Sequence, residues 1–229
     1  MKKYILLLII VLFFPILFHV FSRDASAYAY MGTLLFENKI PYIDGWDHKG
    51  ISLYLINALG YLIGFKNYIG IRFLELILIA LSFLNIYKTL SLKYSKKSAF
   101  IGVSFGLLAL RYFFDDGNLT EEYGAIFVLF AVSLLLKKEQ KTIDYIVIGA
   151  LFIINFTIRA NLISFWIALF FALIVLYVVK KKKLFNLVNI FLKIGLGIVT
   201  GCSFLAIYFL LTDMRFAFAS VVCVLRDLG

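Results

Sequence analysis

Residue types that build cross-linked or metal-stabilised folds are scarce in this sequence of 229 residues. The two cysteines, Cys202 and Cys223, lie in apolar segments, so we expect neither a disulfide framework nor a cysteine metal cluster. The two histidines, His19 and His48, lack the spacing of a metal-binding motif. The sequence therefore indicates no metal site, although it does not exclude a divalent metal as a cofactor. Only two prolines are present, so few helices should be interrupted.

Charged residues are also scarce, because Asp, Glu, Lys and Arg make up 16% of the chain, against about 25% in soluble domains. Hydrophobic residues reach 63%, and several apolar runs exceed the roughly 18 residues that mark a membrane-spanning helix. We therefore predict an all-α, polytopic transmembrane protein with a single membrane domain over residues 1–229. The net charge of +10 does not indicate nucleic-acid binding, because the lysines gather at the ends of apolar runs.

Seven apolar segments are predicted to cross the cell membrane, at residues 4–22, 68–88, 98–114, 122–136, 143–158, 161–179 and 188–211. Lysine clusters before the first span and after the second, fourth and sixth spans place these connections and the N-terminus in the cytoplasm. The first apolar run has an alternative reading as a signal peptide cleaved at Ala25-Ser26-Ala27, but it is longer than such peptides usually are.

The first outer segment, residues 23–67, is too long for an ordinary connector and is predicted to fold as a cap. Its apolar stretch 51–65 would reach only about 22 Å as a helix, short of the ~30 Å hydrocarbon core. Residues 24–38 repeat apolar side chains at helical spacing, as in a helix that lies in the membrane interface. We therefore expect two juxtamembrane helices in this segment.

The arginines and lysines differ in their distribution along the predicted topology. All the arginines fall on the outer half, whereas the cytoplasmic clusters contain only lysine. Since the planar guanidinium group suits phosphate and carboxylate, the outer face is predicted to mix carboxylates with phosphate-binding groups. Arg159 lies between two apolar runs and needs an anionic partner there. Arg72 and Glu75 are i, i+3 on one helix and have the simpler reading of a neutralised pair.

Four motifs in this order carry a resemblance to a known family: Asp24 with Tyr28 and Tyr30, then "GTLLFENKIPYIDGWDHKG", "DDGNLTEEYGAIF" and "IRANLI". Over residues 20–165 the chain resembles glycosyltransferases of the C superfamily, closest to the protein-mannosyltransferase and aminoarabinose-transferase-like group called family 39. In that family a proline follows the lysine of the second motif, whereas Gly50-Ile51-Ser52 stands here.

The resemblance implies an enzyme that transfers a sugar from a polyprenyl-phosphate carrier to a glycan, lipid or protein acceptor at the extracytoplasmic face. An inverting transfer needs a carboxylate base, for which Asp24 is the first choice. Arg159, helped by Lys49 or Arg72, is the candidate for binding the donor phosphate. Glu121 resembles the second acid of the family. Further substrate-binding candidates are Tyr42, Asp44, Trp46, Asp47, Asn118 and Glu122.

Two other classes of protein remain open at this point. A lipid-carrier flippase or transporter would place charges at the bilayer midplane and contain internal repeats, and neither feature is clear. A non-catalytic membrane subunit is favoured by the short chain, because the family's enzymes are usually much longer. The atypical tail, residues 214–229, adds the expectation of a truncated product. The stretch 40–50 also has the simpler reading of a solvated loop.

Overall fold

The fold is all-α, as predicted, in the computed structural model, which describes residues 1–211 apart from 38, 46, 114–116 and 181–183. The predicted tail at 214–229 lies outside the described residues. Within the described part there are nine α-helices, joined in two places by short 3₁₀ segments. Their bounds are α1 Lys2–Phe13, α2 Arg23–Leu34, α3 Ile51–Ile63, α4 Ile69–Lys93, α5 Lys96–Phe113, α6 Thr120–Leu135, α7 Thr142–Ile158, α8 Ile163–Val179 and α9 Leu184–Leu211.

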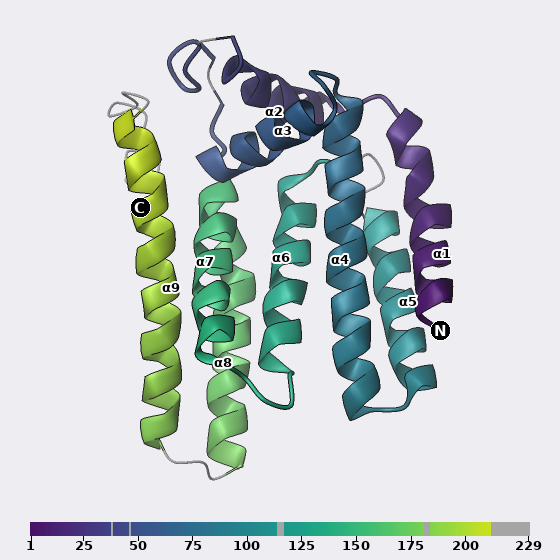
Figure 1. Cartoon of the computed structure of the whole chain (residues 1–229), viewed down its shortest axis with the longest axis vertical. Helices are drawn as coiled ribbons and strands as arrows, with labels where there is room; N and C mark the ends of the chain where they lie inside the picture. Colours follow the sequence, from purple (N-terminus) through teal and green to yellow (C-terminus); the bar gives the residue numbers. More distant parts are fainter. Residues whose placement is uncertain (38, 46, 114–116, 181–183, 212–229) are drawn as a thin grey trace.

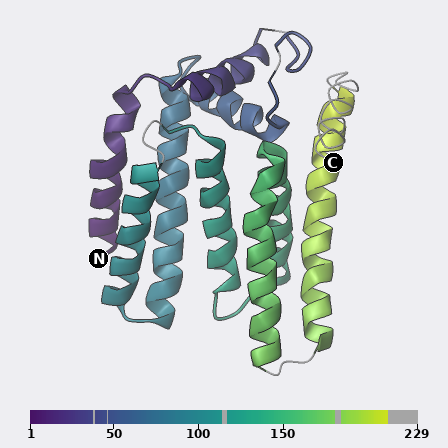
Figure 2. The same cartoon turned by 180° about the vertical axis from the view of Figure 1, so that it is seen from behind.

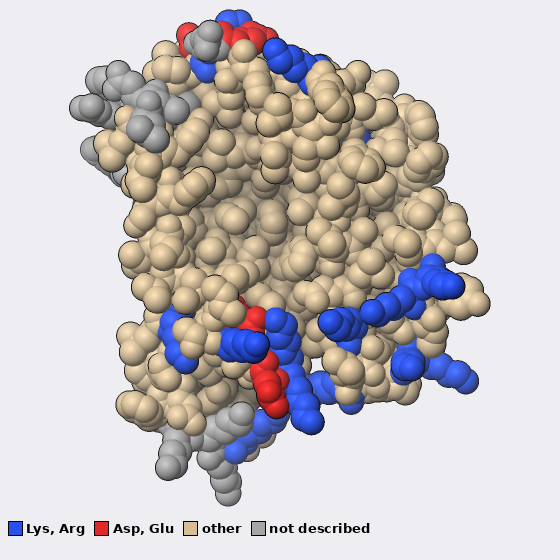
Figure 3. Space-filling view, viewed as in Figure 1, with Lys and Arg blue, Asp and Glu red and all other residues tan. Residues whose placement is uncertain are grey.

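The helices form an upright bundle with two helices across one end. Helices α1, α4, α5, α6, α7, α8 and α9 run roughly along one direction, and α2 and α3 lie crosswise at the upper end of the bundle, above α6 and α7 (Figures 1 and 2). We call this end the capped end. The opposite end, where α4 ends at Lys93 and α5 begins at Lys96, is called the lysine end. Charged side chains gather at these two ends with an uncharged band between them (Figure 3).

Three helices are long and apolar enough to cross a membrane: Ile69–Lys93, Ala160–Val179 and Phe185–Leu210. A fourth span results if Lys2–Phe18 is joined with Arg23–Leu34, although the two pieces are bent by 77°. The predicted number of seven spans is therefore wrong. Helices α6 and α7 have 16 and 17 residues, which reach roughly 24–26 Å at 1.5 Å per residue. Helix α5 carries two lysines and an arginine within its 18 residues.

The cap contains helices in both stretches where the sequence predicts them. The side chain of Ser22 caps α2 by accepting a hydrogen bond from the backbone N–H of Ala25 at 3.4 Å. Helix α3 packs closely against α2, since a Cβ atom on Gly32 would lie 2.7 Å from the Cβ atom of Asn57. Glycine at this position therefore allows the two cap helices to touch through their backbones.

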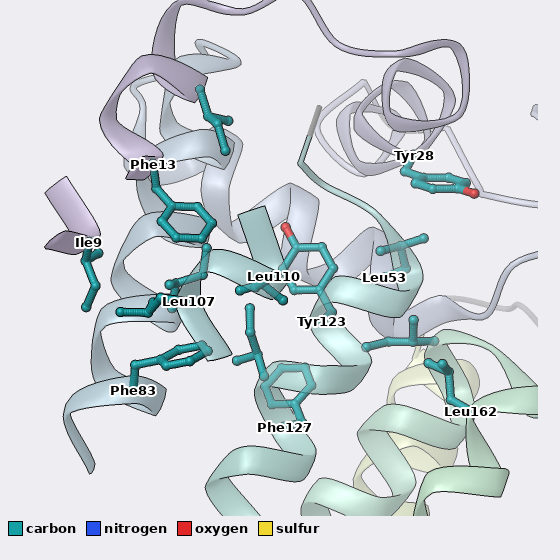
Figure 4. Close-up of a cluster of buried hydrophobic side chains, with 14 of the residues drawn as sticks. Ile9, Phe13, Tyr28, Leu53, Phe83, Leu107, Leu110, Tyr123, Phe127 and Leu162 are labelled. Atoms are coloured by element: carbon teal, nitrogen blue, oxygen red, sulfur yellow. The ribbon is translucent and has the colours of Figure 1, made fainter. Parts of the chain in front are cut away.

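Buried apolar side chains tie the cap to the bundle. The larger cluster includes Ile9 and Phe13 of α1, Phe83 of α4 and Phe127 of α6, and it continues into the cap through Tyr28 and Leu53 (Figure 4). A second cluster around Trp166, which is 1% exposed, joins α6, α7, α8 and α9. The cap is thus fixed to the bundle by the same apolar burial that packs the helices.

Candidate functional site

The second motif contains a turn at residues 40–45 that is closed by its own hydrogen bonds. The carboxylate Oδ2 of Asp44 accepts a hydrogen bond from the backbone N–H of Ile40 at 2.7 Å. The N–H of Tyr42, a residue with φ of 72°, donates to the carbonyl of Gly45 at 2.7 Å. Asp44 therefore shapes the turn, and its own side chain stays exposed. Trp46 lies outside the described residues.

The end of this loop is attached to the C-terminal end of α7. The backbone N–H of Gly50 donates to the carbonyl of Ile158 at 3.0 Å, and the hydroxyls of Ser52 and Thr157 are 2.6 Å apart. A Cβ atom on Gly50 would lie only 1.8 Å from the carbonyl oxygen of Thr157. The chain can approach α7 this closely only with glycine at this position. As a result, the loop lies directly beside Arg159, the residue that follows α7.

Two tyrosines, Tyr42 within the loop and Tyr54 in α3, hold the end of the loop in place. The hydroxyl of Tyr42 donates to the carbonyl of Lys49 at 2.7 Å. The buried hydroxyl of Tyr54 lies 3.1 Å from the same carbonyl and 3.0 Å from Oδ2 of Asp47. The other carboxylate oxygen of Asp47 accepts from the N–H of His48 at 2.7 Å. Tyr42 and Asp47 thus position Lys49, and the aromatic ring of Tyr42 packs 5.5 Å from that of Tyr54.

Lys49 is a buried cation, with only 6% of the residue exposed. Its ammonium nitrogen lies 2.6 Å from Nε2 of His48, whose Nδ1 lies 3.2 Å from Asp47. A neutral imidazole satisfies both contacts by accepting at Nε2 and donating at Nδ1. Burial lowers the pKa of the Lys49 ammonium group, and the charge of Arg159 lowers it further, against the opposing effects of Asp47 and Asp24. Lys49 and Arg159 are therefore close enough to repel each other.

Tyr28, in α2, lies among the same charges. Burial is the main cause that raises the pKa of its hydroxyl to about 12, and the carboxylates of Asp24 and Asp47 add to this increase. Arg159 acts in the opposite direction. Asp24 itself is exposed in the first turn of α2. Both carboxylates and the guanidinium group therefore surround one tyrosine.

Arg159 pairs with Glu121, which lies in the first turn of α6. Its Nη1 contacts Oε1 of Glu121 and lies 3.4 Å from the hydroxyl of Thr120, which in turn is 2.7 Å from Oε2 of Glu121. The anionic partner that Arg159 requires is thus Glu121. Both side chains remain accessible to solvent, with exposed fractions of 34% for Arg159 and 41% for Glu121. An acid in the first turn is also favoured by the helix dipole.

These residues come from four separate segments of the chain and meet at the capped end. We call them the capped-end cluster, which consists of Asp24, Tyr28, Asp47, Lys49, Glu121 and Arg159.

Other predicted residues lie in a buried network below the cap. Arg72 is 3% exposed, its Nη1 lies 3.5 Å from Oε2 of Glu75, and its guanidinium carbon is 4.1 Å from the ring centroid of Phe21. The simpler reading of Arg72 as half of a helical ion pair is therefore confirmed. Glu122 is fully buried near Glu75. A contact of Arg72 or Glu122 with substrate stays a prediction.

Asn118 joins four elements of this network. Its N–H donates to Glu75 at 2.5 Å, and its side-chain amide donates to the carbonyl of Ala25 at 3.1 Å and to Asn57 at 2.9 Å. The hydroxyl of Tyr123 donates back to Asn118 at 3.0 Å. Since Asn118 is completely buried, it acts in this structure as a link between α2, α3, α4 and α6.

Several of these polar residues are absent from the sequence prediction. Asn57 and Ser52 are the polar residues that stand out inside the apolar stretch 51–63, and this contrast was the available signal. Thr120 offered none, because a threonine at the start of a helix is common. Among the described residues, no group of three or more His, Cys, Asp or Glu side chains is arranged to hold a metal ion.

No protein-family model, curated protein or solved structure matches this chain. The likeness to C-superfamily glycosyltransferases rests on the four sequence motifs alone.

Proposed function

We propose that this chain is a multi-pass membrane glycosyltransferase that transfers a sugar from a polyprenyl-phosphate carrier to a glycan, lipid or protein acceptor. The observation that carries the proposal is the pairing of Arg159 with Glu121 beside the buried Lys49 and the carboxylate of Asp24. A transferase of this class needs cations for the leaving phosphate and a carboxylate for the attacking hydroxyl. Both kinds of group occur together at the capped end.

The two cations supply the phosphate-binding part of the reaction. Lys49 pairs with no carboxylate within the described part of the chain, so a bound phosphate would supply the negative charge that it lacks. The contacts of Arg159 with Glu121 and Thr120 use Nη1, and a guanidinium group has further N–H donors suited to phosphate oxygens. As the bond between the sugar and the phosphate breaks, the phosphate keeps the electron pair and these cations stabilise its charge.

Asp24 supplies the base. Its exposed carboxylate accepts the proton of the acceptor hydroxyl while that oxygen forms the new bond to the anomeric carbon. A single displacement of this kind inverts the anomeric configuration. Asp47 is less suited to the task, because only 13% of its side chain is exposed and both oxygens already have partners. We assign Asp47 and Tyr42 to positioning Lys49.

The distribution of charge supports an orientation in the cell membrane. Lysines dominate the lysine end, which the positive-inside rule assigns to the cytoplasm together with the N-terminus. The capped end then faces the extracytoplasmic side. Helix α8 exposes Ile167, Phe171 and Val175, so membrane lipids, including a polyprenyl chain, would meet an apolar surface there.

The test is sugar transfer by the reconstituted full chain, with a panel of polyprenyl-phosphate-linked sugars as donors. Asp24→Asn should lower the transfer rate by about a thousandfold, within the range for loss of a general base. The matched control is Glu37→Gln, which neutralises another exposed carboxylate, one that pairs with Lys39. Equal transfer rates for Asp24→Asn and wild type would contradict the proposal. Lipid movement without any acceptor would indicate a flippase instead.

A further inference from the structure

A second polar surface lies at the lysine end, away from the capped-end cluster. A cavity of about 780 Å³ opens there between the ends of α4 and α8, the connection from α6 to α7, and α9. Lysines contribute much of its charge: Lys88, Lys93, Lys137, Lys138 and Lys180 line it, against the single acid Glu139. The wall thus carries an excess of four positive charges.

Few of these charges are neutralised within the described part of the chain. Lys137 pairs with Asp144 at 2.5 Å, and that carboxylate also accepts from the backbone N–H of Lys141 at 2.8 Å. Lys88, Lys138 and Lys180 are exposed, and no described carboxylate lies within ion-pairing distance of them. The excess positive charge therefore favours an anionic ligand in this cavity.

The rest of the wall is apolar. Leu92, Leu173, Leu176 and Ile190 face the cavity alongside the lysines. The cavity also lies at the ends of helices that are long and apolar enough to span a membrane, namely α4, α8 and α9. An anionic group bound there would lie next to an apolar surface. The hydrocarbon chains of a lipid can pack against that surface, whereas a free anion would make no use of it.

Polar groups in the same wall hold the helices in place. Asn85 donates to the hydroxyl of Ser133 at 2.7 Å, and Thr89 contacts the carbonyl of the same serine at 3.5 Å. Gln140 donates to the carbonyls of Leu135 and Lys137 at 2.9 and 2.6 Å. These bonds join α4 to α6 and hold the connection that follows α6, so this part of the cavity wall is fixed by the fold.

We propose that this cavity binds the phosphate headgroup of an anionic phospholipid, with the lipid chains along the apolar surface of α8. Lysine clusters at the cytoplasmic ends of membrane helices attract anionic headgroups by about 1 kcal/mol for each lysine. Here the cavity adds a defined position to that general attraction. The inference is independent of the proposed sugar transfer, since it uses none of the capped-end residues.

Native mass spectrometry of the full chain in neutral detergent tests it, with short-chain phosphatidylglycerol and phosphatidylcholine of identical chains as probes. Wild type should bind phosphatidylglycerol at least tenfold more tightly than phosphatidylcholine, since three unpaired lysines at about 1 kcal/mol each exceed the roughly 1.4 kcal/mol that a tenfold preference requires. The triple variant K88Q/K138Q/K180Q should bind both lipids equally. The control K66Q/K96Q/K97Q removes three exposed lysines outside the cavity wall and should keep the tenfold preference.

Two outcomes would overturn the inference. Equal loss of preference in the control and in the triple variant would mean diffuse attraction without a site. Displacement of phosphatidylglycerol by millimolar inorganic phosphate would mean that the cavity takes a free anion and makes no use of its apolar wall. Matching thermal unfolding of the variants and wild type ensures that lost binding is not lost folding.

Discussion

Both ends of the molecule carry positive charge, but they hold it in different ways. At the capped end, Lys49 is buried and Arg159 is paired, and carboxylates lie close to both. At the lysine end, the cations are mainly exposed lysines around a cavity with one acid in its wall. The first arrangement fixes the position of each charge through hydrogen bonds from neighbouring segments. The second offers net positive charge on exposed side chains, which suits the attraction of an anionic headgroup better than it suits catalysis.

This contrast predicts that single substitutions matter far more at the capped end. Arg159→Gln should lower sugar transfer by about a thousandfold, because removing one group that stabilises developing negative charge costs about 10²- to 10³-fold. Arg23→Gln removes an exposed arginine from the start of α2 and should leave the rate within about twofold. Initial rates of transfer in proteoliposomes check both variants. Similar rates for the two variants would show that net charge alone matters at this end.

The close packing of the loop against α7 depends on Gly50. Gly50→Ala places a methyl group 1.8 Å from the carbonyl oxygen of Thr157, so the loop must move away from α7. Overpacking of this kind should lower the free energy of unfolding by about 3 kcal/mol. The control is Gly102→Ala in α5, where nothing lies within 4 Å and the better helix propensity should stabilise the protein by about 0.5 kcal/mol. Thermal unfolding in detergent measures both, and equal melting temperatures would contradict the close approach.

A smaller effect is expected in the buried network that supports the cap. Asn118→Gly keeps the positive φ of 56° accessible but removes the side chain that bonds Ala25, Asn57 and Tyr123. Leaving such buried groups unpaired should lower the free energy of unfolding by about 2 kcal/mol. Asn161→Gly, at an exposed position, should cost about 0.5 kcal/mol. Comparable losses for the two variants would mean that the network does not stabilise the cap.

Local features of the fold were predictable from the sequence. The apolar spacing in 24–38 and the short apolar stretch 51–65 predict the two cap helices, and the charge of Arg159 predicts an anionic partner. The number of spans was not predictable from the apolar runs, since the helices α6 and α7 are short and α5 carries charges. An apolar run measures hydrophobicity, whereas crossing a membrane also requires helix length.

The partners within the site could not be read from the sequence. Asn57 and Asn118 are 61 positions apart, and Arg159 meets Glu121 across 38 positions. Pairings of this kind depend on how α3, α6 and α7 pack, and no local pattern encodes them. The close contact at Gly50 has the same origin, because it is set by the position of α7 and not by the turn itself.

The most direct test of the account is to map where a photoreactive polyprenyl phosphate crosslinks to the reconstituted chain. If the donor phosphate binds between Arg159 and Lys49, the crosslinked peptides should come from residues 40–50 and 158–163 at the capped end. Crosslinks confined to the lysine end, at residues 88–93 and 135–140, would contradict the assignment of the capped-end cluster to the donor phosphate.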